Sequence, residues 1–305
     1  MRILQIKSAT TVLARSAISL QCALAFLLLL ACAPPILSAQ QDNSYTSSQL
    51  TPQQLEIEKQ RRRLASSETE ERRDAVMRLG AMKRPESSRV VATVGLRDSS
   101  SIVRATAARA VLSLSSAEAA AALLPVLRDR DEFVRQETAY ALGETRSRTA
   151  TPALVALLLK EKKDSVRGAA VVALGQISDE SAVIPLAELI GRRVPASGIV
   201  NRVKRSKKDE NEFVRRAAAH SLGQIGSRAA VPALVAAVTD ERAPDDVRRE
   251  AANSLGLIGD PAAVPALRAA LTARDPYLSN IASEALRRIA QVETARPASG
   301  LRYLR

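Results

Sequence analysis

The chain has 305 residues and a formal net charge of +13; 46% of its residues are hydrophobic, but only 2% are aromatic and none is tryptophan. Compact domains with a single core take much of their buried area from aromatic side chains. This composition therefore disfavours one large globular core and favours thin layers of Ala, Leu and Val, as in a stacked helical array. The positive charge favours anionic partners, although it also keeps a helical surface soluble.

The first 39 residues are predicted to be an export signal peptide. An apolar run over residues 22–33 follows three basic residues, Arg2, Lys7 and Arg15, and no acidic residue precedes it. A cationic leader before a short apolar segment is typical of secretory signals. We therefore expect the folded part of the chain outside the cytoplasm, in a bacterial periplasm or cell envelope.

Three fates of this segment stay open. Small Ala39 before Gln40 fits cleavage by signal peptidase, which we favour. The sequence Leu-Leu-Ala-Cys that ends at Cys32 resembles a bacterial lipobox and would make Cys32 a lipidated N-terminus. Residues 17–37 are also long enough to remain as an uncleaved membrane anchor. Cleavage after Ala39 would remove both cysteines of the chain, Cys22 and Cys32, and would exclude disulfides, a thiolate nucleophile and cysteine metal sites.

A unit of about 32 residues repeats beyond residue 50. Each full copy contains Val-Arg, an Ala-rich stretch and Leu-Gly, and an earlier, worn copy begins at Arg72. The other copies begin 31, 32, 48, 33 and 31 residues apart, at Val103, Val134, Val166, Val214, Val247 and Leu278. A constant period of this length is typical of solenoids, whose terminal copies are atypical. The one long gap is a normal repeat with about 16 inserted residues.

Each copy is predicted to form a helical hairpin. Apolar or small residues at the first position and at +4, +8 and +11 form the stripe of one amphipathic helix, as in Val166, Ala170, Leu174 and Ile177. A preceding helix is marked by a Pro that fits its first turn, as in the segment 230–234. The recurring Gly near the end of the second helix lets backbones approach closely or ends the helix.

The succession of Ala-Val-Pro-Ala-Leu, an acidic residue, Val-Arg and Ala-x-x-Leu-Gly-x-Ile-Gly resembles HEAT repeats, specifically the PBS-lyase HEAT-like subgroup, over roughly residues 51–293. The resemblance implies an all-α, armadillo-like helical fold: a right-handed α-α superhelix of about seven helical hairpins. It implies little about function, because this scaffold hosts many unrelated activities. We expect this solenoid over 51–293, between a polar, flexible tether at 40–50 and a C-terminal tail at 294–305.

Arginines recur at the second position of the copies, six residues after an acidic residue, as in Asp98 and Arg104 or Glu161 and Arg167. In HEAT arrays, an acid and an arginine in this arrangement form a ladder of charge-assisted hydrogen bonds that joins each repeat to the next. We assign this structural role to Arg104, Arg135, Arg167, Arg215 and Arg248. The alternative is a stripe of anion-binding side chains.

Catalytic chemistry has little support in the sequence. The one histidine, His220, occupies a slot that points away from the buried stripe, and a single His without Cys cannot build a zinc or iron site unaided. HEAT-like proteins that resemble deoxyhypusine hydroxylase need several His-Glu pairs, which this chain lacks, and nothing marks a bilin site. We therefore expect no catalytic residue, cofactor or metal. An enzyme or enzyme subunit of the bilin-lyase or hydroxylase-like type stays the alternative.

Second helices in such arrays line the concave side, and their +2 and +6 positions face outward. Arg and Tyr dominate the energetics of protein interfaces. These positions therefore identify Tyr140 as the first candidate contact, followed by Arg109, Arg216, Arg249 and His220. A solvated helix face without a partner is the alternative.

The insertion over residues 191–212, in the turn of the fifth hairpin, is strongly basic. Insertions in solenoids map to loops on one face and often serve binding, so this loop could engage an acidic protein or anionic lipid. An unstructured charged excursion is the alternative. Its candidate contacts are Arg202, Lys204, Arg205, Lys207 and Lys208. Nucleic acid is disfavoured, because no aromatic residues for base stacking are interleaved with these charges.

The sequence therefore predicts a non-catalytic, exported scaffold or adaptor. It would bind a protein partner, acidic in character, by its concave helix face and its basic loop. Direct binding to a polyanion or to a membrane surface is a further hypothesis.

Overall fold

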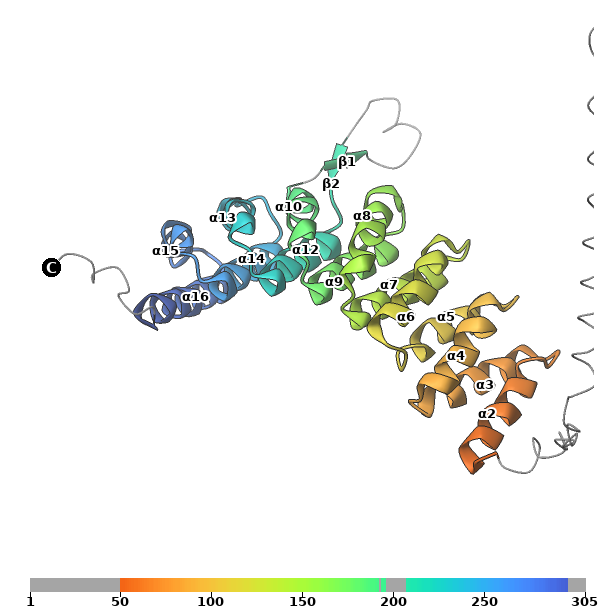
Figure 1. The fold of residues 1–305 in the computed structure, drawn as a ribbon. Helices are drawn as coiled ribbons and strands as arrows, with labels where there is room; N and C mark the ends of the chain where they lie inside the picture. The colour runs from red at the N-terminus through yellow and green to blue at the C-terminus, as the bar shows by residue number, and fades with distance from the viewer. Residues whose placement is uncertain (1–49, 192, 196–206, 296–305) are drawn as a thin grey trace, which may run out of the picture. The chain divides into compact units, whose positions relative to one another are not determined.

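The structure is a computed structural model that describes residues 50–191, 193–195 and 207–295 (Figure 1). For the segments 193–195 and 207–209, it describes the backbone alone. The part of the chain from Pro52 onward forms one unit. Several predictions fall on residues outside these ranges: the signal peptide, Cys32, the tether up to residue 49, Arg202, Lys204, Arg205 and the tail from residue 296.

Seven helical hairpins follow one another from Pro52 to Ala295. The first helices of the hairpins are α2 (Pro52–Arg63), α4 (Pro85–Thr93), α6 (Ser116–Leu123), α8 (Thr151–Lys160), α10 (Val183–Ile190), α13 (Val231–Thr239) and α15 (Val264–Ala270). The second helices are α3 (Thr69–Ala81), α5 (Ser101–Ala110), α7 (Glu132–Thr145), α9 (Asp164–Ile177), α12 (Glu212–Ile225), α14 (Asp245–Ile258) and α16 (Pro276–Ala295). The predicted all-α solenoid of about seven hairpins is confirmed.

Short 3-10 helices extend the first helices. Two follow a first helix, η2 (Gly95–Arg97) and η3 (Leu124–Arg128), and four precede one, η4 (Arg148–Ala150), η5 (Glu180–Ala182), η6 (Arg228–Ala230) and η7 (Pro261–Ala263). Prolines stand in the first turn of α8, α13 and α15, as predicted, where the missing N–H has no helical partner to lose.

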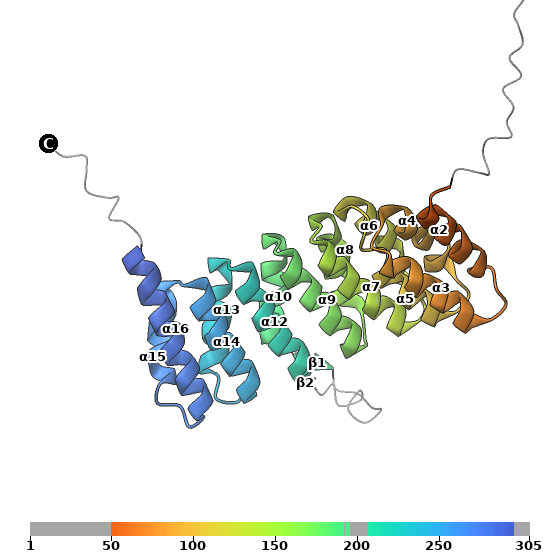
Figure 2. The ribbon, with the colours of Figure 1, turned by 90° about the horizontal axis from the view of Figure 1, so that it is seen from below.

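The hairpins stack in two layers. Each second helix packs against the second helix of the next hairpin, from α3 through α16. Figure 1 shows α8, α10, α13 and α15 on one side of the row formed by α9, α12, α14 and α16. The helices follow one another in chain order along the stack (Figure 2). Each hairpin therefore hides its apolar stripe against its sequence neighbours, as the repeat requires.

The core consists of aliphatic side chains, and the largest fully buried ones are all leucines. Small residues let the second helices approach closely. A Cβ atom at Gly143 of α7 would lie only 2.7 Å from the Cα atom of Ala173 on α9. Other glycines end helices: Gly226 and Gly259, with φ of 73° and 69°, follow α12 and α14 in the left-handed conformation that favours glycine.

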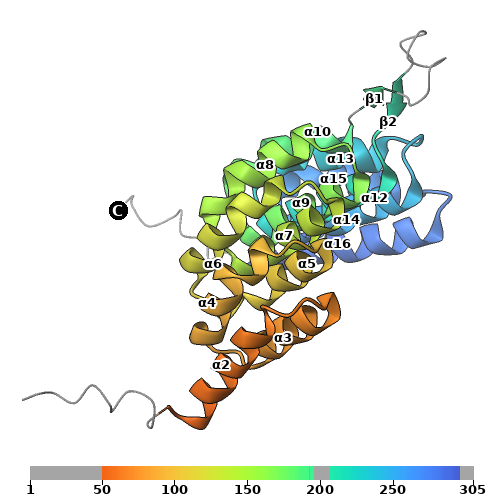
Figure 3. The same ribbon diagram turned by 90° about the vertical axis from the view of Figure 1, so that its right-hand side faces the viewer.

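The insertion lies between α10 and α12 and begins and ends with a short antiparallel pair of strands. Strands β1 (Arg193–Pro195) and β2 (Lys207–Asp209) pair with Arg193 opposite Asp209 and Pro195 opposite Lys207. Figure 3 shows the two strands projecting beyond the helices of the stack. In the described ranges, these two strands are the elements that are not helical. They place the backbone of Lys207 and Lys208 at the base of the insertion.

The close approach at Gly143 gives a direct test of the packing. We expect Gly143→Ala to reduce the free energy of unfolding by about 1–3 kcal/mol, because the added methyl group meets backbone that cannot move away. Gly191 is the matched control: a Cβ atom there has no neighbour within 4 Å among the described residues. Urea unfolding should show a change of less than about 0.5 kcal/mol for Gly191→Ala, and equal effects of the two substitutions would contradict the packing.

Candidate functional site

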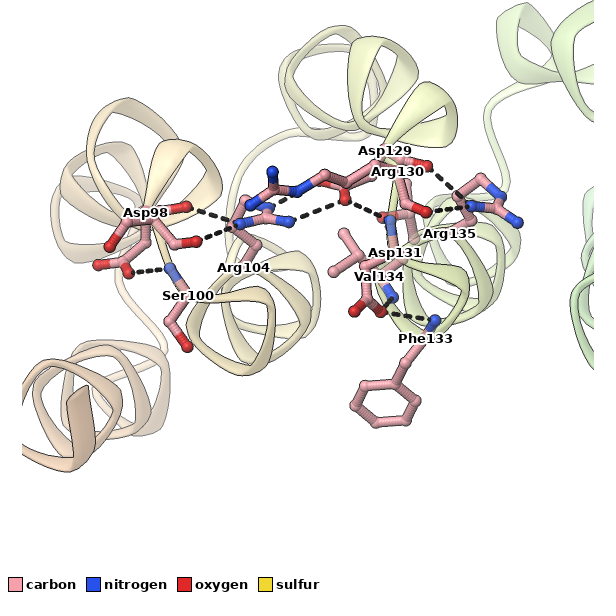
Figure 4. Close-up of polar contacts among 11 residues, drawn as sticks. Asp98, Ser100, Arg104, Asp129, Arg130, Asp131, Phe133, Val134 and Arg135 are labelled. Carbon is pink, nitrogen blue, oxygen red and sulfur yellow. Dashed lines mark hydrogen bonds and ion pairs between the residues drawn. The ribbon is translucent and has the colours of Figure 1, made fainter.

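Arginine side chains join each hairpin to the next. Arg104 of α5 donates from Nε and Nη2 to the two carboxylate oxygens of Asp129, at 2.7 and 2.9 Å. Its Nη1 donates to the backbone carbonyls of Asp98 and Ser99, at 2.8 and 3.0 Å. Figure 4 shows Arg104 between the loop that contains Asp98 and the loop of the next hairpin that contains Asp129. One guanidinium thus fastens two consecutive loops in a two-pronged geometry that carboxylates favour.

We call the series of such pairs the arginine ladder, and each pair a rung. Its rungs in the described residues are Arg72–Asp98, Arg104–Asp129, Arg135–Glu161, Arg167–Glu210 and Arg249–Asp275. Each arginine thus pairs with the acid of the following hairpin. The acid six residues earlier contributes a backbone carbonyl, as Asp98 does to Arg104 and Asp129 to Arg135.

The rungs keep their charges despite burial. Burial is the strongest influence on Asp129 and would raise its pKa, but the hydrogen bonds from Arg104 and from the backbone N–H of Asp131 outweigh it and leave the pKa below its usual range. The pKa of Asp98 is lowered in the same way, against the effect of burial, by Arg72 and the N–H of Ser100. Ionised partners are therefore the ground state of these two rungs.

The ladder is interrupted at α12: neither Arg215 nor Arg248, both assigned to the ladder from the sequence, pairs with an acid of the next hairpin in the described residues. Arg215 is buried, at 5% exposure, but it forms no rung in the described part of the chain. Arg248 donates to the carbonyl of Val238 at 3.2 Å, and Arg249 takes the rung with Asp275. The physical reason is the loop before α16: Asp275 directly precedes this helix, so the arginine one position further along α14 meets it.

The predicted contact residues are largely paired within the molecule. Arg109 lies 3.3 Å from Glu137 and 3.7 Å from Glu144, and Arg216 lies 3.5 Å from Asp246. The Nδ1 atom of His220 lies 2.9 Å from Glu250, and Arg249 belongs to the ladder. Tyr140 is half-buried against the core. The charges of the predicted face are therefore compensated from one second helix to the next.

Three exposed aromatic residues escaped the sequence analysis: Phe133, Phe213 and Tyr277, with 44%, 42% and 66% exposure. Each directly precedes the first residue of its repeat, a position counted neither in the buried stripe nor on the outward face. Their aromatic side chains could have identified them, because the sequence has so few aromatic residues and the described buried core contains none.

Two of these aromatic rings lie against the preceding second helix. A Cβ atom at Gly168 of α9 would lie 2.2 Å from a ring carbon of Phe213, so the ring rests on the backbone of α9. The guanidinium carbon of Arg249 lies 5.0 Å from the centre of the Tyr277 ring, a cation–π distance. Phe133 holds the same position on α7, and its ring points away from the ladder in Figure 4.

Three aromatic side chains lie on second helices at the middle of the stack, and Glu137 lies between two of them on α7. Phe133 and Tyr140 on α7 and Phe213 on α12, which we call the aromatic band, flank α9, where Val172 and Gly168 lie between them. Ion pairs border the band on both sides. On the α14 side they line a hollow of about 210 Å³ that includes Arg216, Asp246, Arg249, Glu250 and Arg288. An apolar centre within a polar rim is the usual anatomy of a protein interface.

Across the described ranges, no three His, Cys, Asp or Glu side chains gather as a potential metal site. No helix of these ranges is both long and apolar enough to cross a membrane. The buried charges of the described residues belong to the rungs of the ladder, except for Arg215.

Comparison with known families decides the classification. The profile of HEAT repeats matches residues 61–142, 120–198, 193–245 and 241–298, which span most of the stack. The chain belongs to the HEAT-repeat family. Comparison with curated proteins gave no match.

Several solved structures are similar to this chain. YibA of Escherichia coli has 19% sequence identity over 78% of this chain and 82% of its own, with a TM-score of 0.54. The complex of CpcE and CpcF of the phycocyanin lyase from Nostoc sp. PCC7120 has 22% identity over 84% and 97%, with a TM-score of 0.46. Human deoxyhypusine hydroxylase has 21% identity over 78% and 96%, with a TM-score of 0.36. At these identities, the likeness concerns the fold alone.

The corrected rung can be tested with adjacent residues. Arg249→Met should lower the Tm clearly more than Arg248→Met, because it leaves the carboxylate of Asp275, whose side chain is 7% exposed, without its cation. Arg248→Met removes one hydrogen bond to a carbonyl and a longer, more exposed ion pair with Asp245 at 3.8 Å. Thermal unfolding followed by circular dichroism gives both values, and a larger effect at Arg248 would restore the original assignment.

Proposed function

We propose that this HEAT-repeat chain is a non-catalytic scaffold that binds a protein partner through the aromatic band. The exposure of Phe133 and Phe213, in a chain whose described core contains no aromatic residue, carries the proposal. An aromatic ring that a stable core does not need gains most from burial against another protein. Tyr140 belongs to the same surface, which keeps it a candidate contact.

The charged residues have a secondary part in this proposal. Since Arg109 and Arg216 already face carboxylates, they would act at the rim, where charges govern orientation and association rate more than affinity. An acidic character of the partner rests on the net charge of +13 and on the inserted loop with Arg202, Lys204, Arg205, Lys207 and Lys208. Contact of that loop with anionic lipid or another polyanion is the alternative.

Export is part of the proposal. The cationic leader and apolar run of residues 1–39 support a periplasmic or cell-envelope location. Intact-mass measurement of the protein from its native cells separates the three fates: a chain starting at Gln40, a lipidated chain starting at Cys32, or an uncleaved anchor. A cytoplasmic, full-length protein would contradict export.

An enzyme or enzyme subunit of the bilin-lyase or hydroxylase-like type is the second candidate. It is favoured by the fold likeness to the phycocyanin lyase and deoxyhypusine hydroxylase structures. The single histidine of the sequence, His220, disfavours a di-iron centre. Stoichiometric iron, zinc or bilin in the purified protein would support this candidate over the scaffold.

The aromatic band makes the scaffold testable. We expect the double substitution Phe133→Ala and Phe213→Ala to weaken partner binding at least about tenfold. The reason is that an aromatic side chain buried at the centre of an interface contributes about 1 kcal/mol or more to binding. The measurement is quantitative affinity capture from native membranes and periplasm, followed by titration of the captured protein.

Ile184 provides the matched control, because it is a large apolar residue with 70% exposure on the first helix α10. Ile184→Ala should leave binding unchanged. Equal loss in both variants would contradict the aromatic band as the binding surface. Circular dichroism of the double variant checks that the stack is retained.

A further inference from the structure

We propose that Arg215, at the interruption of the arginine ladder, binds a carboxylate group supplied from outside the chain. Arg215 has 5% exposure, and its Nε atom is enclosed without a hydrogen-bond partner in the described residues. An enclosed N–H group without an acceptor is costly, because it has lost its water and gained no hydrogen bond in return. Arg215 is therefore a receiving group whose partner is not part of the described fold.

The complete rungs define the ligand. At Arg72, Arg104 and Arg249, the Nε atom donates to one carboxylate oxygen at 2.7 Å, and Nη2 donates to the other at 3.0, 2.9 and 2.9 Å. The Nε atom that makes the shorter of these bonds is the one left unpaired in Arg215. A planar group with two oxygens, presented edge-on, would complete the same fork. A carboxylate has this shape.

In the loop before α14, a basic residue stands where the other hairpins have the acid of the rung. Asp98, Asp129 and Glu161 each lie three residues before the second helix of their hairpin, which begins at Ser101, Glu132 and Asp164. Helix α14 begins at Asp245, so the corresponding position holds Arg242. A cation there cannot form the rung with Arg215.

The nearby acids of this loop are directed elsewhere. Asp240 accepts from the backbone N–H of Arg242 at 3.0 Å, and Asp245 lies 3.8 Å from Nη1 of Arg248. Glu241 is exposed and lines a separate open groove of about 870 Å³ between the sixth and seventh hairpins. None of the three pairs with Arg215 in the described part of the chain, which leaves the rung open to an external carboxylate.

Two sources could supply this group: a free small carboxylate, or an Asp or Glu side chain of a bound protein. The test is thermal unfolding of the full-length chain in increasing acetate, with chloride matched for ionic strength. At ten times the half-saturating concentration, the Tm should rise by about 3–6 °C. A second arm uses a short blocked peptide containing Glu, with its Gln counterpart as control.

Three variants make the result specific. Arg215→Met should abolish the rise, whereas Arg216→Met, which removes the neighbouring exposed arginine of the same helix, should keep it. Arg242→Asp, which restores an internal acid at the rung position, should raise the Tm without ligand and remove the response to acetate. Saturation by acetate identifies a free ligand, and saturation by the Glu peptide alone identifies a protein side chain.

Two outcomes of the Tm measurement would overturn the proposal. One is a rise in Tm with acetate that persists in Arg215→Met, and the other is a wild-type Tm that changes with neither acetate nor the peptide. A response that appears only after Asp209→Asn would likewise refute an external ligand, because it would assign the rung to the acid six residues before Arg215.

Discussion

A helical hairpin of this chain can bury its apolar stripe only against the next hairpin, and every other feature of the structure follows from this constraint. Two short helices with an Ala, Leu and Val stripe enclose no core of their own. Stability is therefore generated at the joints between hairpins, where leucines such as Leu142 and Leu174 are fully buried. Gly143 permits the close approach at one such joint.

The arginine ladder adds direction to this stacking. Apolar contact alone tolerates sliding, whereas a two-pronged pair such as Arg104 with Asp129 fixes one hairpin against the next. Buried pairs of this kind specify an arrangement more than they stabilise it, because desolvation consumes much of the attraction. The joint between α12 and α14 then lacks its rung, although Arg216 with Asp246 and His220 with Glu250 still connect the two helices.

The same constraint explains where a partner can bind. Since the interior needs only small aliphatic residues, aromatic rings are left for the surface, where Phe213 rests on the backbone of α9 at Gly168. The ring of Phe213 thus lies at the joint between α9 and α12, while the residue stays 42% exposed. A partner that covers the aromatic band would therefore contact several second helices at once and bind only a correctly stacked array.

The sequence predicted the hairpins well because the repeat states the buried stripe several times over. The sequence did not predict side-chain pairs whose geometry depends on how two neighbouring repeats align. The exchange of Arg248 for Arg249 follows from the loop before Asp275, whose position relative to α16 no single copy reveals. The pairing of Arg216 with Asp246 likewise depends on how two second helices align. The strands β1 and β2 arise in the one segment that does not repeat, where no comparison between copies was possible.

Hydrogen–deuterium exchange of Arg104→Met against the wild-type chain tests the central claim, that each hairpin is held by its neighbours alone. Breaking this rung should speed amide exchange in α5 and α7, on either side of the joint, and leave α14 and α16 unchanged, because stability in a linear array is a sum of local and nearest-neighbour contributions. A uniform increase from α3 to α16 would show a single cooperative core instead, and would contradict both the joint-by-joint stability and the role given to the ladder.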